Sequence, residues 1–218
     1  MALKLYAHPL SSYCWKVLIA LYENGTPFEF RQLDAEHEEN GRELAALWPI
    51  GKMPVLSDRG RAIAESSIII EYLGLHHRGP VTLVPHHADP DAALKVRMMD
   101  RAFDNYVMTP VQQVVFDRIR PAETRNPHDV ALARALLDKA YGWLESALAG
   151  RSWAAGEDFS MADCAAAPAL HYADKVRPLR DGFPTLGAYL DRLEARPSFA
   201  RVLEEAAPYA HMFPQEPA

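Results

Sequence analysis

Short apolar runs alternate with amphipathic stretches through the first third of the chain. The patterns predict strands at residues 3–6, 28–30, 54–57 and 61–64, and helices at about 12–24, 41–47 and 66–75. Asp58-Arg59-Gly60 separates the last two strands as a hairpin turn, and Asn24-Gly25 ends the first helix. The order β-α-β-α-β-β-α predicts a small mixed sheet covered by helices.

Helix breakers follow this region and divide the chain. Gly79-Pro80, Pro85 and Pro90 indicate a linker, and nearly everything after Pro90 has helical periodicity. We therefore expect an α+β domain followed by an all-α helical bundle. The predicted bounds are 1–77 for the first domain, 78–90 for the linker and 91–218 for the second domain.

Two patterns in the second half predict particular local structures. Four apolar residues share one face of a long amphipathic stretch: Leu94, Met98, Phe103 and Val107. Pro110 is expected to bend that helix. Further on, Ser160 and Asp163 have the spacing of a capping box, in which each residue satisfies a backbone amide of the other.

Composition and charge narrow the class of protein. The chain has 218 residues, 49% hydrophobic and 24% charged, with a formal net charge of −6 and no basic cluster, which argues against a nucleic-acid partner. Its two cysteines, Cys14 and Cys164, are too few for a disulfide framework or a cysteine-rich zinc site. We find neither a signal peptide nor a membrane-spanning run, and therefore expect a cytoplasmic protein.

Five short stretches, in order along the chain, resemble the cytosolic glutathione transferases. They are Ser11-Ser12-Tyr13-Cys14-Trp15-Lys16-Val17, Lys52-Met53-Pro54-Val55-Leu56, Glu65-Ser66, Phe159-Ser160-Met161-Ala162-Asp163 and Arg196-Pro197-Ser198-Phe199. The resemblance covers nearly the whole chain, and the first stretch is most similar to the serine-type classes, Zeta in particular, with Phi and Theta nearby. It implies a thioredoxin-like glutathione-binding domain, a helical domain that shapes the second substrate's pocket, a role in detoxification and a homodimer.

Ser11 is the candidate catalytic residue. It stands where a strand turns into a helix, and the amino end of a helix favours an anion. Serine-type members of the family use the matching serine to hydrogen-bond the glutathione thiolate, which lowers the thiol pKa. The competing interpretation is that Ser11 only caps the helix.

Cys14 raises a redox alternative. Thioredoxins and glutaredoxins carry C-x-x-C at this turn, and here Ser11 replaces the first, attacking cysteine. Cys14 is expected to be a small buried hydrophobe. Tyr6 and Tyr13 are also near the turn, as the hydroxyl of tyrosine-type members would be, and are expected to serve as packing or pocket-wall residues.

The resemblance also implies the glutathione-binding residues. Pro54 matches the cis-proline of thioredoxin-like folds, so that Met53 would offer its backbone to the cysteinyl unit of glutathione. Glu65 and Ser66 would hold the γ-glutamyl end. The complete predicted set is Ser11, Ser12, Asn40, Lys52, Met53, Pro54, Glu65 and Ser66, with His37 as a further candidate for the glycyl end.

The second substrate's pocket is predicted from the same resemblance. Thr109–Gln113 is similar to a stretch of the Zeta class that reaches toward the active site, which makes Leu10, Tyr13, Tyr106 and Gln113 the candidate pocket residues. No metal site is expected, because the pairs His76-His77 and His86-His87 have no carboxylate or cysteine pattern to complete one.

The predicted function is glutathione transfer to a small hydrophobic electrophile. Three alternatives stay open: a glutathione-dependent cis-trans isomerase of the maleylacetoacetate type, a non-catalytic glutathione-binding or ligand-carrier protein, and a thiol-disulfide oxidoreductase using Cys14. Glutathione is the expected co-substrate. The identity of the electrophile does not follow from the sequence.

Overall fold

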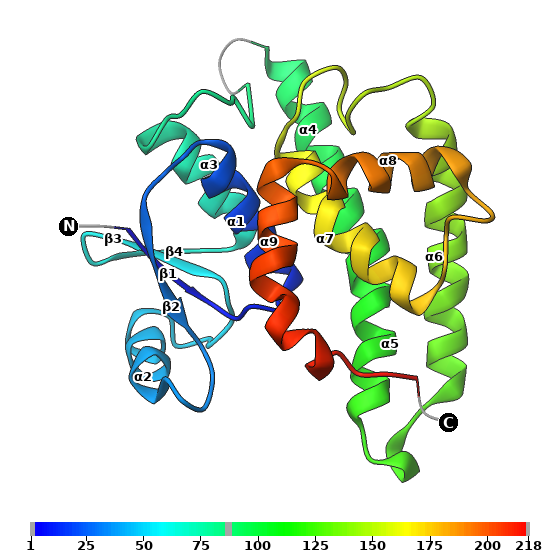
Figure 1. The fold of residues 1–218 in the computed structure, drawn as a ribbon, viewed down its shortest axis with the longest axis horizontal. Helices are drawn as coiled ribbons and strands as arrows, with labels where there is room; N and C mark the ends of the chain where they lie inside the picture. The colour runs from blue at the N-terminus through cyan, green and yellow to red at the C-terminus, as the bar shows by residue number, and fades with distance from the viewer. Residues whose placement is uncertain (1–2, 86–88, 217–218) are drawn as a thin grey trace.

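The computed structural model describes residues 3–85 and 89–216, so His86 and His87 lie outside the described residues. Its amino-terminal half has the element order that the sequence predicts, as Figure 1 shows. The elements are β1 (Leu3–Ala7), α1 (Ser12–Glu23), β2 (Phe28–Gln32), α2 (Glu38–Leu47), β3 (Val55–Asp58), β4 (Arg61–Ala64) and α3 (Ser66–His76).

The four strands form one mixed sheet in the order β2-β1-β3-β4. Strand β1 pairs parallel with β2 and antiparallel with β3, which pairs antiparallel with β4. Successive side chains of β1 point to opposite faces of the sheet. Leu5 packs into the large core with α1 and α3, whereas Tyr6 packs with Leu44 of α2. The sheet is therefore covered by α1 and α3 on one face and by α2 on the other.

The carboxy-terminal half is helical. Its elements are α4 (Pro90–Ala102), a π-helical segment η1 (Phe103–Met108), α5 (Thr109–Ile119), the 3₁₀ turn η2 (Ala122–Thr124), α6 (Pro127–Ala147), α7 (Met161–Val176), α8 (Pro184–Glu194), α9 (Pro197–Ala206) and the 3₁₀ turn η3 (Ala207–Met212). This arrangement confirms the predicted fold class, a thioredoxin-like α+β domain followed by an all-α bundle.

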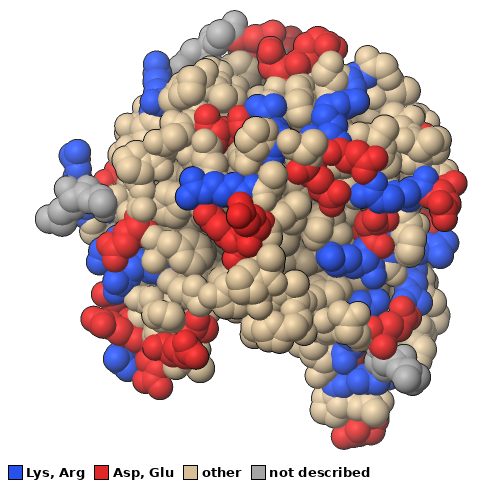
Figure 2. Space-filling model, in the orientation of Figure 1, with Lys and Arg blue, Asp and Glu red and all other residues tan. Residues whose placement is uncertain are grey.

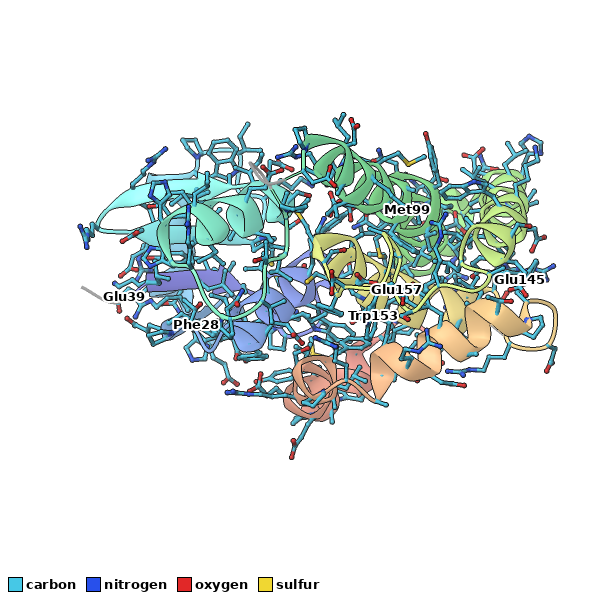
Figure 3. The ribbon with its side chains drawn as sticks, turned by 90° about the horizontal axis from the view of Figure 1, so that it is seen from above. Phe28, Glu39, Met99, Glu145, Trp153 and Glu157 are labelled. Carbon is cyan, nitrogen blue, oxygen red and sulfur yellow. The ribbon has the colours of Figure 1, made fainter. Side chains whose placement is uncertain are left out.

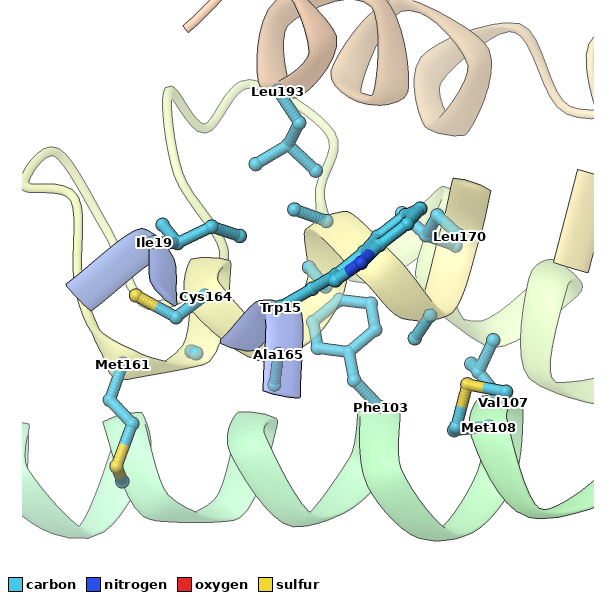
Figure 4. Close-up of a cluster of buried hydrophobic side chains, with 14 of the residues drawn as sticks. Trp15, Ile19, Phe103, Val107, Met108, Met161, Cys164, Ala165, Leu170 and Leu193 are labelled. Carbon is cyan, nitrogen blue, oxygen red and sulfur yellow. The ribbon is translucent and has the colours of Figure 1, made fainter. Parts of the chain in front are cut away.

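Helix α1 joins the two halves, because it contacts the sheet's helix α3 as well as α7 and α9 of the bundle. Trp15 of α1 points into a buried cluster with Phe103, Leu170 and Leu193 (Figure 4). Seen from above, the sheet with Phe28 lies beside the bundle that carries Met99 and Trp153 (Figure 3). A shared core therefore fixes the position of one half against the other.

The structure corrects one predicted helix face. Phe103 and Val107 are buried, but Leu94 and Met98 point to solvent, and α4 buries Ala93, Val96 and Met99 instead. The apolar residues of α4 follow two faces, and the sequence pattern does not say which of them meets the core.

Pro110 was predicted to bend this long helix. The chain instead stays helical from α4 through α5, with the π-helical segment just before Pro110. Pro110 follows that segment in the first turn of α5, where proline is tolerated. The predicted capping box of α7 is confirmed, with the Ser160 amide donating to the Asp163 carboxylate at 2.8 Å.

Candidate active site

A cleft of about 830 Å³ lies between the two halves. In Figure 2 a notch at the lower edge separates the lobe that carries α2 from the end of α5. The first domain contributes the turn from β1 to α1, the loop before β3 and the start of α3 to the walls of the cleft. The helical half contributes the end of α4, the π-helical segment with α5, Tyr172 of α7, and residues 212–214 at the end of η3 and after it. Of the sequence-predicted residues it contains Leu10, Ser11, Ser12, Tyr13, Lys52, Met53, Pro54, Glu65 and Ser66.

Ser11 is both the cap of α1 and a residue of the cleft. Its Oγ accepts a hydrogen bond from the Cys14 amide at 3.4 Å, which satisfies one free donor of the helix end. A hydroxyl that accepts through a lone pair still has its own proton to donate. The first turn of α1 contains no acidic residue, so the positive end of the helix dipole is not neutralised there. The two sequence interpretations, cap and anion stabiliser, are thus compatible in one side chain.

The Cys14 side chain is fully buried. Burial raises the pKa of its thiol to about 11, although a hydrogen bond with Ser11 opposes the shift. A thiol with this pKa is almost entirely protonated at neutral pH. Because disulfide exchange requires a thiolate, this geometry disfavours the redox alternative.

The two tyrosines near the turn have different positions. Tyr13 lines the cleft, and burial raises its pKa to about 12, with the charge of Asp104 as the next cause. Its hydroxyl therefore stays protonated and can donate at neutral pH. Tyr6 lies outside the cleft, where its hydroxyl donates to Glu43 Oε2 at 2.5 Å, and it is a packing residue.

The loop before β3 and the start of α3 bring the other predicted groups together. The Met53-Pro54 peptide bond is cis, as the sequence predicts, and both residues line the cleft with Lys52. Glu65 has φ 69°, in the left-handed region that non-glycine residues rarely adopt. Ser66 follows it as the first residue of α3, so free amides of that helix end face the same cleft.

Four residues that the sequence analysis named as site candidates do not line the cleft: His37, Asn40, Tyr106 and Gln113. The side chain of Asn40 is buried and donates from Nδ2 to the Gln32 carbonyl at 2.8 Å, in a separate hollow with His37. Tyr106 and Gln113 are exposed beside the cleft. The residues one position before them, Asn105 and Gln112, line it instead.

Both residues were predicted from the resemblance of Thr109–Gln113 to a Zeta-class stretch. The π-helical segment from Phe103 to Met108 uses more residues per turn than an α-helix, so the side chains that face the cleft do not keep one period of 3.6 residues along this helix.

A buried charged cluster under the cleft was missed by the sequence reasoning. Lys16 Nζ lies 2.5 Å from Asp100 and 2.8 Å from Asp104, and it donates to Ser67 Oγ at 2.8 Å. Arg101 binds the same two carboxylates and lines the cleft with Asp104. Burial raises the pKa of Asp104, and Lys16 opposes this shift. The sequence held one signal of this cluster, because Lys16 lies among the apolar residues of the predicted first helix.

The side of the cleft formed by the helical half is mainly apolar. Met108, Val111 and Val115 contribute from one wall, and Tyr172 contributes from α7. The Tyr172 hydroxyl donates to the Leu10 carbonyl at 2.8 Å, which fixes the ring beside the β1–α1 turn. Sequence reasoning did not identify Tyr172, because its spacing within α7 only indicates core.

Within residues 3–85 and 89–216, no three His, Cys, Asp or Glu side chains gather as a potential metal-binding group. No helix there has both the length and the apolar character of a membrane span.

Comparison with protein-family models agrees with this geometry. Residues 5–81 match the glutathione S-transferase N-terminal domain, and residues 116–192 match the glutathione S-transferase C-terminal domain. Together the two matches cover more than half of the chain. The chain belongs to the glutathione S-transferase family. The first match contains most of β1 and all of β2 to α3, with the cleft residues of the β1–α1 turn, the loop before β3 and the start of α3, and the second runs from the end of α5 into α8.

Individual relatives of this glutathione S-transferase family member carry more than one kind of name. It is 28% identical to glutathione S-transferase F13 of Arabidopsis thaliana, over 93% of this chain and 95% of that protein. It is 30% identical to FtsZ-localized protein A of Caulobacter vibrioides, over 95% of each. Among solved structures, a Methylobacterium radiotolerans glutathione S-transferase in complex with glutathione sulfonate is 29% identical, with a TM-score of 0.79, covering 100% of this chain and 97% of that one.

Proposed function

We propose that this chain is a serine-type glutathione transferase in which the Ser11 hydroxyl donates a hydrogen bond to the glutathione thiolate. The observation that carries the proposal is the position of Ser11, which lines the cleft at the amino end of α1. Because Oγ accepts from the Cys14 amide, the hydroxyl proton is free to bind an anion. A charge-assisted hydrogen bond favours the thiolate over the thiol and lowers its pKa.

The remaining predicted groups bind the rest of glutathione. Ser66 and the free amides of α3 receive the γ-glutamyl carboxylate, and the Glu65 carboxylate receives the γ-glutamyl ammonium. The Met53 backbone pairs with the cysteinyl unit. Lys52 pairs with the remaining carboxylate, and Ser12 completes the site beside Ser11.

The reaction joins the glutathione sulfur to carbon. The thiol releases its proton to solvent, and the thiolate forms a carbon–sulfur bond with an electrophile held against the apolar wall of the cleft. A leaving group then departs with its electron pair, or the adduct carbanion takes up a proton. The protein supplies the orientation of both reactants and the stabilisation of the thiolate.

Ser11→Ala tests this role. We expect at least a tenfold lower kcat with 1-chloro-2,4-dinitrobenzene and a higher apparent thiol pKa in the pH–rate profile, because about 1.5–3 kcal/mol of stabilisation is lost. Glutathione affinity in titration calorimetry should stay within a few-fold. Ser146→Ala, an exposed serine of α6, is the matched control. A Ser11→Ala variant with the wild-type rate and thiol pKa would reduce Ser11 to a helix cap.

A non-catalytic role has one supporting observation, the name of the Caulobacter relative, which refers to localisation with FtsZ rather than to transfer. The same assay separates the two functions. Glutathione binding in calorimetry without turnover of any electrophile in a chemically diverse panel would favour a binding protein and contradict the transferase proposal.

We also propose that the protein is a homodimer. Four large apolar side chains are exposed on α3 and α4: Ile68, Leu75, Leu94 and Met98. An ion pair between Glu71 and Arg97 at 2.8 Å holds these two helices together, so the apolar residues form one surface. A second copy of the chain that packs against this surface would remove the apolar side chains from water, which favours a dimer. Sedimentation equilibrium should show a dimer, and Met98→Glu should shift it toward monomer; a wild-type monomer at micromolar concentration contradicts the proposal.

A further inference from the structure

The chain after η3 forms one side of the cleft. In Figure 1 it leaves the end of α9 and crosses to α5. Met212, Phe213 and Pro214 line the cleft, and the Phe213 ring stacks on Tyr172 with 5.4 Å between centroids. This segment is therefore part of the second-substrate wall.

Two arginines bind the end of this segment. Arg118 of α5 donates from Nη1 to the Pro214 carbonyl at 3.1 Å and from Nη2 to Glu216 Oε2 at 3.4 Å. Arg134 of α6 donates to Glu216 Oε1 at 2.5 Å. The two guanidinium groups thus converge on one carboxylate.

Among residues 3–85 and 89–216, two arginines and one carboxylate meet at this point. Only 6% of the Arg118 side chain is exposed, compared with 61% of Glu216. Burial lowers the pKa of Arg118, Glu216 opposes this shift and Arg134 adds to it. The Nε atoms of both arginines are buried, and no described residue accepts a hydrogen bond from either. Within the described part of the chain, one exposed carboxylate therefore pairs with two guanidinium groups that have unused donors.

The arginine pair adjoins the cleft along α5. Val115 lines the cleft one helical turn before Arg118, and Pro214, whose carbonyl Arg118 holds, lines it from the other side. A substrate lying along this wall would reach the pair with its far end. Both arginines already bind the carboxylate of Glu216, so a carboxylate is the kind of group that this arginine pair binds.

We propose that Arg118 and Arg134 form an anion subsite at the end of the second-substrate cleft, which selects electrophiles bearing a carboxylate. Glu216 holds the two guanidinium groups when no such substrate is present, and the substrate carboxylate replaces it. The inference rests on the proposed transferase function and narrows its substrates to apolar electrophiles with a carboxylate distant from the reacting carbon.

The test compares two electrophiles that react alike and differ in charge. With both 1-chloro-2,4-dinitrobenzene and 4-chloro-3,5-dinitrobenzoate, the glutathione sulfur bonds to the ring carbon, chloride leaves with its electron pair, and the thiol proton goes to solvent. The readout is the ratio of kcat/KM for the carboxylate substrate to kcat/KM for the neutral one. This ratio cancels effects on glutathione binding and on the amount of folded protein.

Arg118→Met should lower this ratio about tenfold or more, since it removes a charge-assisted contact with the carboxylate. Glu216→Gln should raise the ratio, because it removes the competing carboxylate and leaves both arginines in place. Arg120→Met is the matched control, since Arg120 is an exposed arginine near the same end of α5, and it should leave the ratio unchanged.

An unchanged ratio in Arg118→Met, or a lower ratio in Glu216→Gln, would overturn the anion subsite while leaving the transferase function intact. If neither electrophile is consumed, the transferase proposal fails instead. Titration calorimetry with 3,5-dinitrobenzoate then decides the subsite alone: binding that weakens in Arg118→Met and strengthens in Glu216→Gln supports it, and equal affinity in all variants refutes it.

Discussion

Replacing Lys16 with methionine should destabilise the fold strongly. Lys16 is 1% exposed and its ammonium binds the carboxylates of Asp100 and Asp104 as well as the Ser67 hydroxyl. Methionine fills a similar volume but carries no charge, so two buried carboxylates each lose one cationic partner, which for Asp100 is the shorter of its two. Such carboxylates are costly to leave uncompensated.

The magnitude follows from what remains in the cluster. Breaking a buried ion pair by removing one partner costs about 3–5 kcal/mol. Arg101 stays beside Asp100 at 2.7 Å and beside Asp104 at 2.5 Å, but half of its side chain is exposed, so its compensation is partial. We therefore expect a loss of about 3 kcal/mol in the free energy of unfolding. With an m-value of about 1–3 kcal/mol/M, the urea midpoint should fall by about 1 M or more.

The effect should depend on pH in a defined direction. Burial raises the pKa of Asp104 and Lys16 opposes the shift, so removing Lys16 raises that pKa further. A carboxyl whose pKa is higher in the folded state favours folding at low pH and loses that contribution as pH rises from the unfolded value near 4. The Lys16→Met loss, measured by urea unfolding, should therefore be smaller at pH 5 than at pH 8.

Two comparisons make this prediction refutable. Lys139→Met, at an exposed position of α6, should change the unfolding free energy by less than about 0.5 kcal/mol. Adding Asp104→Asn to Lys16→Met should restore part of the lost stability, because one uncompensated charge disappears. Equal losses in the two lysine variants, or a double variant less stable than Lys16→Met, would show that the cluster is not held by charge.

Three further predictions concern single sites. Glu65→Ala and Ser66→Ala should each weaken glutathione binding in calorimetry while the pKa of the bound thiol stays near wild type; unchanged affinity in both would remove them from the site. Asp163→Ala should cost about 3 kcal/mol, because the buried carboxylate accepts four hydrogen bonds, and the thermal midpoint should fall while turnover per folded molecule is kept. Cys14→Ser should keep most conjugating activity, and mass spectrometry of wild type after incubation with oxidised glutathione should show no modification at Cys14; stoichiometric glutathionylation there would revive the redox alternative.

Features that depend on residues within one helical turn could be predicted from the sequence. The Ser11 cap and the Ser160–Asp163 capping box each need only a few neighbouring residues, and the structure contains both. The placement of Ser66 at the start of α3 follows from the same kind of local signal. The cis bond before Pro54 is also present, but it was predicted from the family resemblance and not from its neighbours. Ser11, Pro54 and Ser66 all line the cleft in which the glutathione site is proposed.

Features that depend on distant contacts could not be predicted in this way. Lys16 and Asp104 are 88 positions apart in the sequence, and Tyr172 and Leu10 are 162 positions apart. No pattern of neighbouring residues can therefore predict either contact. The exposure of Met98 was missed for a related reason, because amphipathicity identifies an apolar face without saying what will cover it. The anion subsite likewise requires knowing that the chain end returns to α5.

The winding of the π-helical segment between α4 and α5 determines which side chains of α5 face the cleft. Each residue of an α-helix turns the chain by about 100°. Rewinding Phe103–Met108 as a regular α-helix, with the same number of residues but more rotation per residue, would turn the whole of α5 by on the order of 100° while α4 kept its place against α7. Gln112 and Val115 would then leave the cleft and a neighbouring row of side chains would enter it. A change in the winding of this one segment can therefore present a new wall to the cleft without replacing any residue of that wall.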